Sequence, residues 1–171
     1  MKILETERLI LRQASLEDAS IILALLNEPS FIRNIGDRGV RTLGEAFNYI
    51  LTRLIASYEN NGFGMYLVLV KETGIPAGIG GLVKRDGLDE VDIGYAFLPQ
   101  HWSRGYASES ALAVGEYARD TIGLNRLVGI TDPENHASVR ALKKIGLKFE
   151  KMVRLAEDDI DLKLYSIDFS Q

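Results

Sequence analysis

The stretch that decides the fold is Leu98-Pro99-Gln100-His101-Trp102-Ser103-Arg104-Gly105-Tyr106-Ala107-Ser108-Glu109. Before it, residues 90–97 alternate apolar side chains with smaller or polar ones, which predicts a strand with one buried face. Pro99 cannot donate a hydrogen bond to a sheet, so it ends that strand. Apolar residues then recur at helical spacing from Ala107 to Ala118, so a helix begins near Ser103 or Gly105.

The start of that helix predicts a site for an anion. The first N–H groups of a helix have no partner within it and lie at the positive end of its dipole. Gly105 has no Cβ, so a diphosphate can lie directly against these groups, and Arg104 adds positive charge. An ordinary strand-to-helix turn has the same pattern, so the rest of the chain must decide between the two.

The composition predicts one globular domain and excludes several functions. The chain has 171 residues, of which 46% are hydrophobic and 26% charged, and its net charge is −4 without a basic run. This argues against nucleic-acid binding. There is no cysteine, and His101 and His136 are the two imidazoles, so we expect no disulfide, no thiolate chemistry and no metal site.

The distribution of charge also bears on location. Lys2 and Glu5 introduce charge at the start of the sequence, which argues against a signal peptide. No uncharged stretch approaches the roughly 20 residues that a membrane span requires. We therefore expect a cytoplasmic protein that does not bind a membrane.

Periodicity along the chain predicts a mixed α+β fold in the order βααβββαβαββ. The expected helices begin at Ser15, Thr42, Ser103 or Gly105, and Asn135, the first two with capping boxes. Pro29 marks the end of the first, and the apolar stripe of the second, from Leu43 to Tyr58, is expected to be core. The expected strands are 9–11, 65–70, 77–84, 90–97, 124–131, a strand from 148, and 159–168.

Two glycine-containing segments are interpreted structurally. Gly78-Ile79-Gly80-Gly81 is not a dinucleotide fingerprint, because Val83 occupies the third glycine position and no helix follows. Small residues that let a neighbouring segment approach closely are the better explanation. Gly146 ends the helix that begins at Asn135, as a left-handed C-cap.

Three segments resemble the GNAT superfamily of N-acetyltransferases. Trp102–Glu109, preceded by Ile93-Gly94-Tyr95 and Leu98-Pro99, resembles its coenzyme A pyrophosphate loop. Thr6–Arg12 resembles the T-E-R-L-x-L-R start of the branch that acetylates ribosomal-protein N-termini (RimJ/RimL type). Asn135–Leu147 resembles the N-x-x-S-x-x-x-x-x-x-x-G-[FL] segment. Together they cover nearly the whole chain, as a single N-acetyltransferase domain over residues 1–171.

The resemblance implies a central mixed, mostly antiparallel sheet flanked by helices, with acetyl-CoA as co-substrate. Acetyl-CoA would lie where the strand 89–98 diverges from 124–131. Its pantetheine amides would pair with the strand edge at Ile93, Gly94 and Tyr95, whose N–H groups would also polarise the thioester carbonyl. The remaining expected cofactor contacts are Trp102, Ser103, Arg104, Gly105, Tyr106, Ala107, Ser108, Asn135 and Ser138. Trp102 and Ser103 depart from the family pattern, but these positions contribute mainly backbone N–H groups.

The resemblance also implies an acid for the leaving thiolate. In related enzymes a serine at the position of Ser138 lies near the coenzyme A sulfur. Many other branches carry a tyrosine four residues later, where this chain has Leu142. Ser138, or a water that it holds, is therefore the candidate acid. The alternatives from the residues alone are a surface hydroxyl for Ser138 and a helix N-cap for Asn135.

The base is less constrained by the sequence. Amide formation requires a free amine, so a group must take the proton of the ammonium. Asp92 lies where the family often places a carboxylate, and Glu90 precedes it by two residues on the same strand face. Each is alternatively a solvated strand residue, and a chain of water would also suffice. The acidic segment 157–159 is a solvated turn or a flank of the acceptor entrance.

These observations predict an acetyl-CoA-dependent N-acetyltransferase that acts on a primary amine by direct attack, without an acyl-enzyme. The acceptor is a protein N-terminus or a small amine, and a homodimer is left open. The alternative is a non-catalytic acyl-CoA-binding sensor or scaffold. A P-loop NTPase and a serine hydrolase are disfavoured, because G-x-x-x-x-G-K-[ST] and G-x-S-x-G do not occur.

Overall fold

The structure, a computed structural model, describes residues 1–155 and 160–170. Its strands and helices follow in this order: β1 Lys2–Glu5, β2 Leu9–Arg12, α1 Ala19–Leu26, α2 Pro29–Asn34, α3 Leu43–Tyr49, α4 Ala56–Asn61, β3 Met65–Val70, β4 Pro76–Val83, β5 Asp92–Phe97, α5 Tyr106–Tyr117, β6 Arg126–Thr131, α6 His136–Lys144, β7 Lys148–Val153 and β8 Leu162–Asp168. A π-helical segment, Ile50–Ile55, joins α3 to α4, and another, Ala118–Ile122, extends α5.

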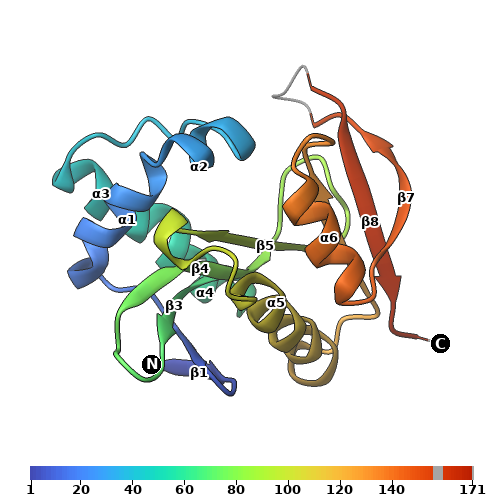
Figure 1. The fold of residues 1–171 in the computed structure, drawn as a ribbon, viewed down its shortest axis with the longest axis horizontal. Helices are drawn as coiled ribbons and strands as arrows, with labels where there is room; N and C mark the ends of the chain where they lie inside the picture. The colour runs from blue at the N-terminus through green and yellow to red at the C-terminus, as the bar shows by residue number, and fades with distance from the viewer. Residues whose placement is uncertain (156–159, 171) are drawn as a thin grey trace.

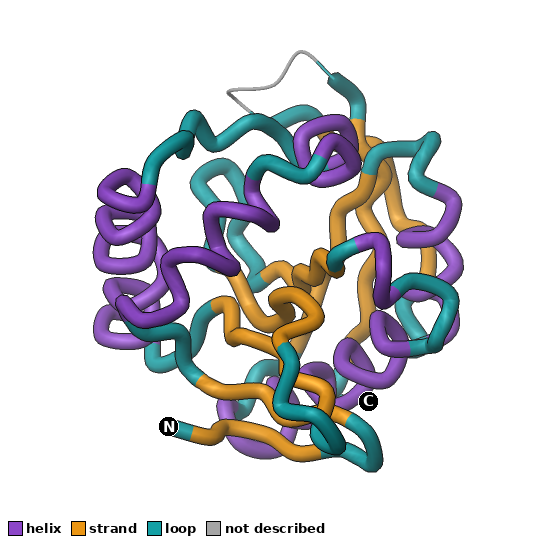
Figure 2. Tube along the Cα trace, turned by 60° about the vertical axis from the view of Figure 1, so that its left-hand side comes forward, coloured by secondary structure: helices purple, strands orange, loops and turns teal. Residues whose placement is uncertain are grey.

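The strands form one sheet in the order β1-β2-β3-β4-β5-β6-β8-β7. Every neighbouring pair is antiparallel except β5 and β6, which are parallel. Figure 1 shows α1 to α3 on one side of the molecule, α6 with β7 and β8 on the other, and β4, β5 and α5 between them. Figure 2 shows helices on either side of the strands. The expected fold class is confirmed.

Two hydrophobic cores cover the two faces of the sheet. One lies under α5 and α6, and the other lies under α1 and α3. Consecutive residues of β3 enter different cores: Tyr66 and Val68 the first, Leu67 the second. The continuous apolar run of this strand therefore reflects burial on both faces.

Several local signals act as predicted. The hydroxyl of Thr42 accepts a hydrogen bond from the N–H of Glu45 at 3.1 Å, which caps α3. Gly146 follows α6 with φ of +100°, a left-handed conformation that glycine adopts without strain. Gly78 and Gly81 permit close strand approach, since a Cβ on either would lie 2.1 Å from a backbone oxygen.

Three expectations are corrected by the structure. The strand β1 was not predicted, because it is short and has charged residues at both ends. Pro29 does not only follow α1; it begins α2, where its missing N–H costs no hydrogen bond. The stripe of the second helix is only partly core, because its inner row is buried while the adjacent row is 42–49% exposed. The buried row is Ala46, Ile50 and Leu54, and the exposed row is Leu43, Phe47 and Leu51.

Candidate active site

The parallel strands β5 and β6 are paired at a single position, where Asp92 lies opposite Val128. There the N–H of Val128 donates to the C=O of Val91 at 3.0 Å. A second rung would require the N–H of Ile130 to donate to the C=O of Ile93. Instead it donates to the carboxylate of Asp92 at 3.3 Å. The ladder therefore stops, and we call the part beyond it, from Ile93 in β5 and from residue 129 in β6, the β5–β6 fork.

The fork leaves backbone groups of β5 without a strand partner. Backbone groups of alternate residues point to the same side of a strand, and the C=O of Val91 points toward β6. The C=O of Ile93 and both backbone groups of Tyr95 consequently face the fork. Gly94, which is paired with Gly81, faces β4. Of the three predicted edge residues, the structure brings Ile93 and Tyr95 to the fork through their backbones, but not Gly94.

Residues 98–105 connect the end of β5 to the helix α5. Gly105, with φ of +83°, is its N-cap, and the first N–H to be paired within the helix is that of Glu109, which donates to the C=O of Gly105 at 3.0 Å. In the described part of the chain, no group accepts from the N–H groups of Tyr106, Ala107 and Ser108. Three adjacent donors therefore remain available for an anion.

The loop before α5 has an unusual backbone and one anchor. Ser103 has φ of +61°, and it is the one non-glycine residue with positive φ among those the structure describes. A side chain is strained in this left-handed conformation, which glycine adopts without strain. The indole N–H of Trp102 donates to the C=O of Phe97 at 2.8 Å, which ties the loop to the end of β5. Arg104 is exposed beside Gly105.

The first turn of α6 faces the fork from the other side. Asn135 is the N-cap, and its side-chain oxygen accepts from the N–H of Ser138 at 3.3 Å. The hydroxyl of Tyr95 donates to the C=O of Ser138 at 3.1 Å and lies 3.2 Å from its Oγ. Tyr95 thus crosses from β5 to α6. Burial raises the pKa of Tyr95 to about 12, so its hydroxyl is protonated at neutral pH.

Sequence reasoning assigned Tyr95 a backbone contact and missed its side chain. The signal that could have found it is the strand alternation, which places Tyr95 on the same face as Ile93 and Phe97, the face toward α5 and α6. Leu142 is 1% exposed, and a Cβ on Gly129 would lie 2.6 Å from its Cδ2. Position 142 is therefore part of the core, whereas the hydroxyl of Tyr95 lies beside Ser138.

The two predicted carboxylates occupy different environments. Asp92 is 1% exposed, and Arg85 Nε donates to its Oδ2 at 2.6 Å. Burial raises the pKa of Asp92 to about 6, although Arg85 and the N–H of Ile130 oppose the shift. Glu90 accepts from Arg126 Nε at 3.1 Å. It precedes the rung between β5 and β6, so the structure does not bring it together with Tyr95 and Ser138.

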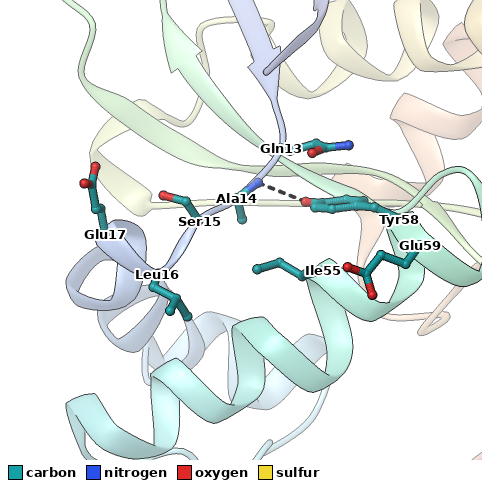
Figure 3. A pocket seen from close by; sticks show the side chains of 8 residues that line it. All are labelled: Gln13, Ala14, Ser15, Leu16, Glu17, Ile55, Tyr58 and Glu59. Carbon is teal, nitrogen blue, oxygen red and sulfur yellow. Dashed lines mark hydrogen bonds between the residues drawn. The ribbon is translucent and has the colours of Figure 1, made fainter.

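A separate hollow lies between the end of β2 and α4. It is lined by Gln13, Ala14, Ser15, Leu16, Glu17, Ile55, Tyr58 and Glu59. In Figure 3 the hydroxyl of Tyr58 accepts from the N–H of Ala14, at 3.0 Å. None of the predicted site residues lines this hollow.

Nowhere in residues 1–155 and 160–170 do three or more His, Cys, Asp or Glu side chains gather as a metal would require. None of the helices described is both long and apolar enough to span a membrane. The acidic segment 157–159 predicted from the sequence lies outside the described residues.

Comparison with known proteins identifies the family. The model of an acetyltransferase (GNAT) domain matches residues 8–148. The chain belongs to the GNAT acetyltransferase family. It is 32% identical over 154 residues to the uncharacterized N-acetyltransferase YoaA of Bacillus subtilis (strain 168), a match that covers 89% of this chain and 86% of YoaA.

Solved structures agree with this assignment. A GNAT-family acetyltransferase from Bacillus anthracis has a TM-score of 0.81 at 25% identity, over 100% of both chains. RimL, a ribosomal L7/L12 alpha-N-protein acetyltransferase in complex with coenzyme A, has a TM-score of 0.83 at 20% identity, over 98% of both chains. The second likeness shows a shared fold. The predicted family and enzyme class, an N-acetyltransferase, are confirmed.

Proposed function

We propose that the chain transfers the acetyl group of acetyl-CoA to a primary amine at the β5–β6 fork. The observation that carries the proposal is that the unpaired backbone groups of β5 lie beside the hydroxyls of Tyr95 and Ser138. The free edge of β5 at Ile93 and Tyr95 suits an extended group that carries amides. The unpaired N–H groups at the start of α5 suit a diphosphate. Together these features fit the two halves of coenzyme A.

Acetyl-CoA supplies an activated acyl group, and the chain's residues would assist its transfer. The amine nitrogen bonds to the acetyl carbon as the carbon–sulfur bond breaks, so the amine loses a proton and the sulfur gains one. The N–H of Tyr95 faces the fork, where it can stabilise negative charge on an oxygen. Ser138, held by Tyr95 and Asn135, can donate the proton that the leaving sulfur takes.

The proton of the amine has a different destination in our proposal. The pKa of Asp92, about 6, suits a base, but both of its oxygens already accept hydrogen bonds. We propose that Asp92 and Arg85 hold the fork open and that water takes the proton. The acceptor amine belongs to a protein N-terminus or to a small molecule, and the same panel of amines tests both.

Acetyl-CoA binding is tested first, by thermal unfolding. At about a hundred times its dissociation constant, acetyl-CoA adds ~2.7 kcal/mol to the free energy of unfolding. For a chain of this length the melting temperature rises by roughly 5–10 °C. NADH and ATP should not produce this rise. An unshifted melting curve would remove acetyl-CoA from the proposal.

Turnover is tested next, by release of free coenzyme A with a panel of small amines and peptides with free N-termini. Release should rise with pH as the acceptor ammonium deprotonates. A melting shift without release from any amine would instead favour the sensor or scaffold. Sedimentation of the same sample gives the oligomeric state.

A further inference from the structure

We propose that Arg8, in the turn between β1 and β2, is a ligand for the phosphate groups of coenzyme A. The inference rests on the proposed function, and it adds to the site a residue about a hundred positions before the α5 loop. It would make the N-terminal hairpin part of the cofactor site.

The side chain of Arg8 is fixed in place at the start of α5. Its Nε donates to Glu109 Oε1 at 2.7 Å, and its backbone N–H donates to Glu109 Oε2 at 3.0 Å. The hydroxyl of Thr6 donates to the same oxygen at 2.5 Å. The Cζ of Arg8 lies 4.8 Å from the ring centroid of Tyr106. Contacts on several sides therefore restrict the guanidinium to one position.

The unoccupied part of the guanidinium lies beside the anion site. Arg8 Nη2 is 3.3 Å from the point where a Cβ of Gly105 would lie. Neither Nη1 nor Nη2 makes a hydrogen bond within the described residues. The neighbouring N–H groups at the start of α5 are also unpaired. Guanidinium nitrogens and backbone N–H groups thus offer their protons at the same place.

The chemistry of this arrangement selects a phosphate. A guanidinium donates two parallel hydrogen bonds to phosphate oxygens, and it cannot lose its proton in a protein. A positive charge at the N-terminus of a helix is unfavourable, because it faces the positive end of the dipole. Glu109 offsets part of this cost through Nε, and an anion held by Nη1 and Nη2 would offset the remainder. Coenzyme A has phosphate at its diphosphate and at its 3′-position.

The competing explanation is that Arg8 and Glu109 only tie the hairpin to α5. An ion pair of partly exposed groups would then change the stability of the free protein and leave the ligand contacts alone. The two explanations differ in what they predict for ligands with and without phosphate. The dissociation constants should therefore be measured by calorimetry for coenzyme A, 3′-dephospho-coenzyme A and pantetheine.

Arg8→Gln is the test variant, and Arg119→Gln is its matched control. Arg119 is exposed, pairs with Asp120 and lies beyond the C-terminal end of α5, so its loss changes the net charge by the same amount. We expect Arg8→Gln to weaken coenzyme A binding by roughly 10–100-fold, as the loss of a charge-assisted hydrogen bond does. Pantetheine binding should be unchanged. Equal weakening for 3′-dephospho-coenzyme A places Arg8 on the diphosphate, and weakening for coenzyme A alone places it on the 3′-phosphate.

Other results overturn the inference. Wild-type affinity for coenzyme A in Arg8→Gln, or an equal loss in Arg119→Gln, would leave Arg8 as a structural tie. If Arg8→Gln does not fold, Arg8→Lys decides, because it keeps the charge but cannot donate two parallel hydrogen bonds. Binding at wild-type strength by Arg8→Lys would then refute a bidentate ligand. If the wild type itself binds no coenzyme A, the proposed function fails, and that outcome is separate from the failure of Arg8.

Discussion

The two ends of the β5–β6 junction are built from different chemical groups. The closed end, where β5 and β6 are paired and the residues just before that pairing lie, contains ion pairs. These are Asp92 with Arg85, and Glu90 with Arg126. The open end, the β5–β6 fork, contains neutral groups. These are the hydroxyls of Tyr95 and Ser138 and the unpaired backbone groups of β5.

The difference shows where charged side chains are stable in this fold and where neutral groups take their place. A buried charge is stable only when it is paired and hydrogen-bonded, so the buried carboxylate of Asp92 is held by Arg85. The half-buried carboxylate of Glu90 is held by Arg126. Groups held this way fix the strands but are poorly placed to exchange protons with a substrate. Neutral hydroxyls and N–H groups need no counter-ion, so they can lie at the open end without a charged partner. We therefore expect variants of the open end to change binding and turnover, and variants of the closed end to change mainly stability.

The largest expected effect is that of Gly105→Val at the anion site. A valine there requires a left-handed conformation and places its side chain against the unpaired N–H groups and Arg8. Losing two hydrogen bonds to a charged group corresponds to about a hundredfold or more in affinity. The melting shift caused by acetyl-CoA should therefore disappear.

Gly123→Val is the matched control for this variant. Gly123 also has φ of +83°, and a Cβ there would have no atom within 4 Å. It carries the same backbone strain, so it should lower the melting temperature of the free protein but keep the shift caused by acetyl-CoA. If both variants keep the shift, the start of α5 is not the diphosphate site.

The second expected effect is on turnover. Ser138→Ala removes the proposed proton donor and leaves the N-cap of α6, whose acceptor is the side chain of Asn135. General acid catalysis typically contributes ~10²–10⁴ in rate, and a thiolate is a good leaving group, so we expect a loss of about a hundredfold. The dissociation constant of acetyl-CoA should change little. A fall in affinity that matches the fall in rate would make Ser138 a cofactor ligand instead.

The third expected effect is smaller. Tyr95→Phe removes the hydroxyl that holds Ser138 but keeps the backbone groups at the edge of β5. The loss of one neutral hydrogen bond corresponds to about tenfold, and it should appear in kcat rather than in KM. In the Ser138→Ala background the same substitution should have almost no effect on kcat, because its target is gone. Independent effects in the double variant would show that Tyr95 does not act through Ser138.

The sequence predicts local backbone features better than contacts between distant segments. The loop 98–109 and the cap at Asn135 can be interpreted locally, because Pro99, Gly105 and Asn135 act on their own backbone or on the next turn. The strand β3 follows equally well from its apolar run. The loop positions the unpaired N–H groups of α5, and the cap fixes the start of α6. Neighbouring residues are enough to specify both.

The missed features depend on contacts between distant segments. Arg8 and Glu109 are 101 positions apart, and Tyr95 and Ser138 are 43 apart. Periodicity predicts which face a residue occupies but not the partner it meets there. The contact of Asp92 with the N–H of Ile130 has a further cause, since it depends on where β6 stops pairing with β5. A carboxylate at the start of the strand that borders the site, such as Asp92, consequently looks the same in the sequence in both roles. It could be a catalytic base, or it could only hold the strands in place.

The smallest expected effect on turnover is that of Asp92→Asn, which separates these two roles. Asparagine keeps one oxygen for the N–H of Ile130 but does not titrate. If Asp92 is scaffold and water takes the proton, kcat should remain within about threefold of the wild type. A loss of about a hundredfold or more would instead restore Asp92 as the base. Glu90→Gln is the control, and it should leave kcat unchanged in either case.

The same variant predicts how stability depends on pH. Because the pKa of Asp92 in the folded protein, about 6, lies above its ordinary value of 3.8, the folded state binds this proton more tightly than the unfolded state does. The stability from protonation is complete below about pH 4 and is lost as the pH rises to about 6. Urea unfolding of both proteins from pH 4 to 8 measures the difference in unfolding free energy, wild type minus Asp92→Asn. This difference should fall between about pH 4 and pH 6 and stay constant above it. A difference that stays constant from pH 4 to 8 would mean that Arg85 offsets or outweighs burial, since a folded-state pKa at or below the ordinary value moves any change to below about pH 4.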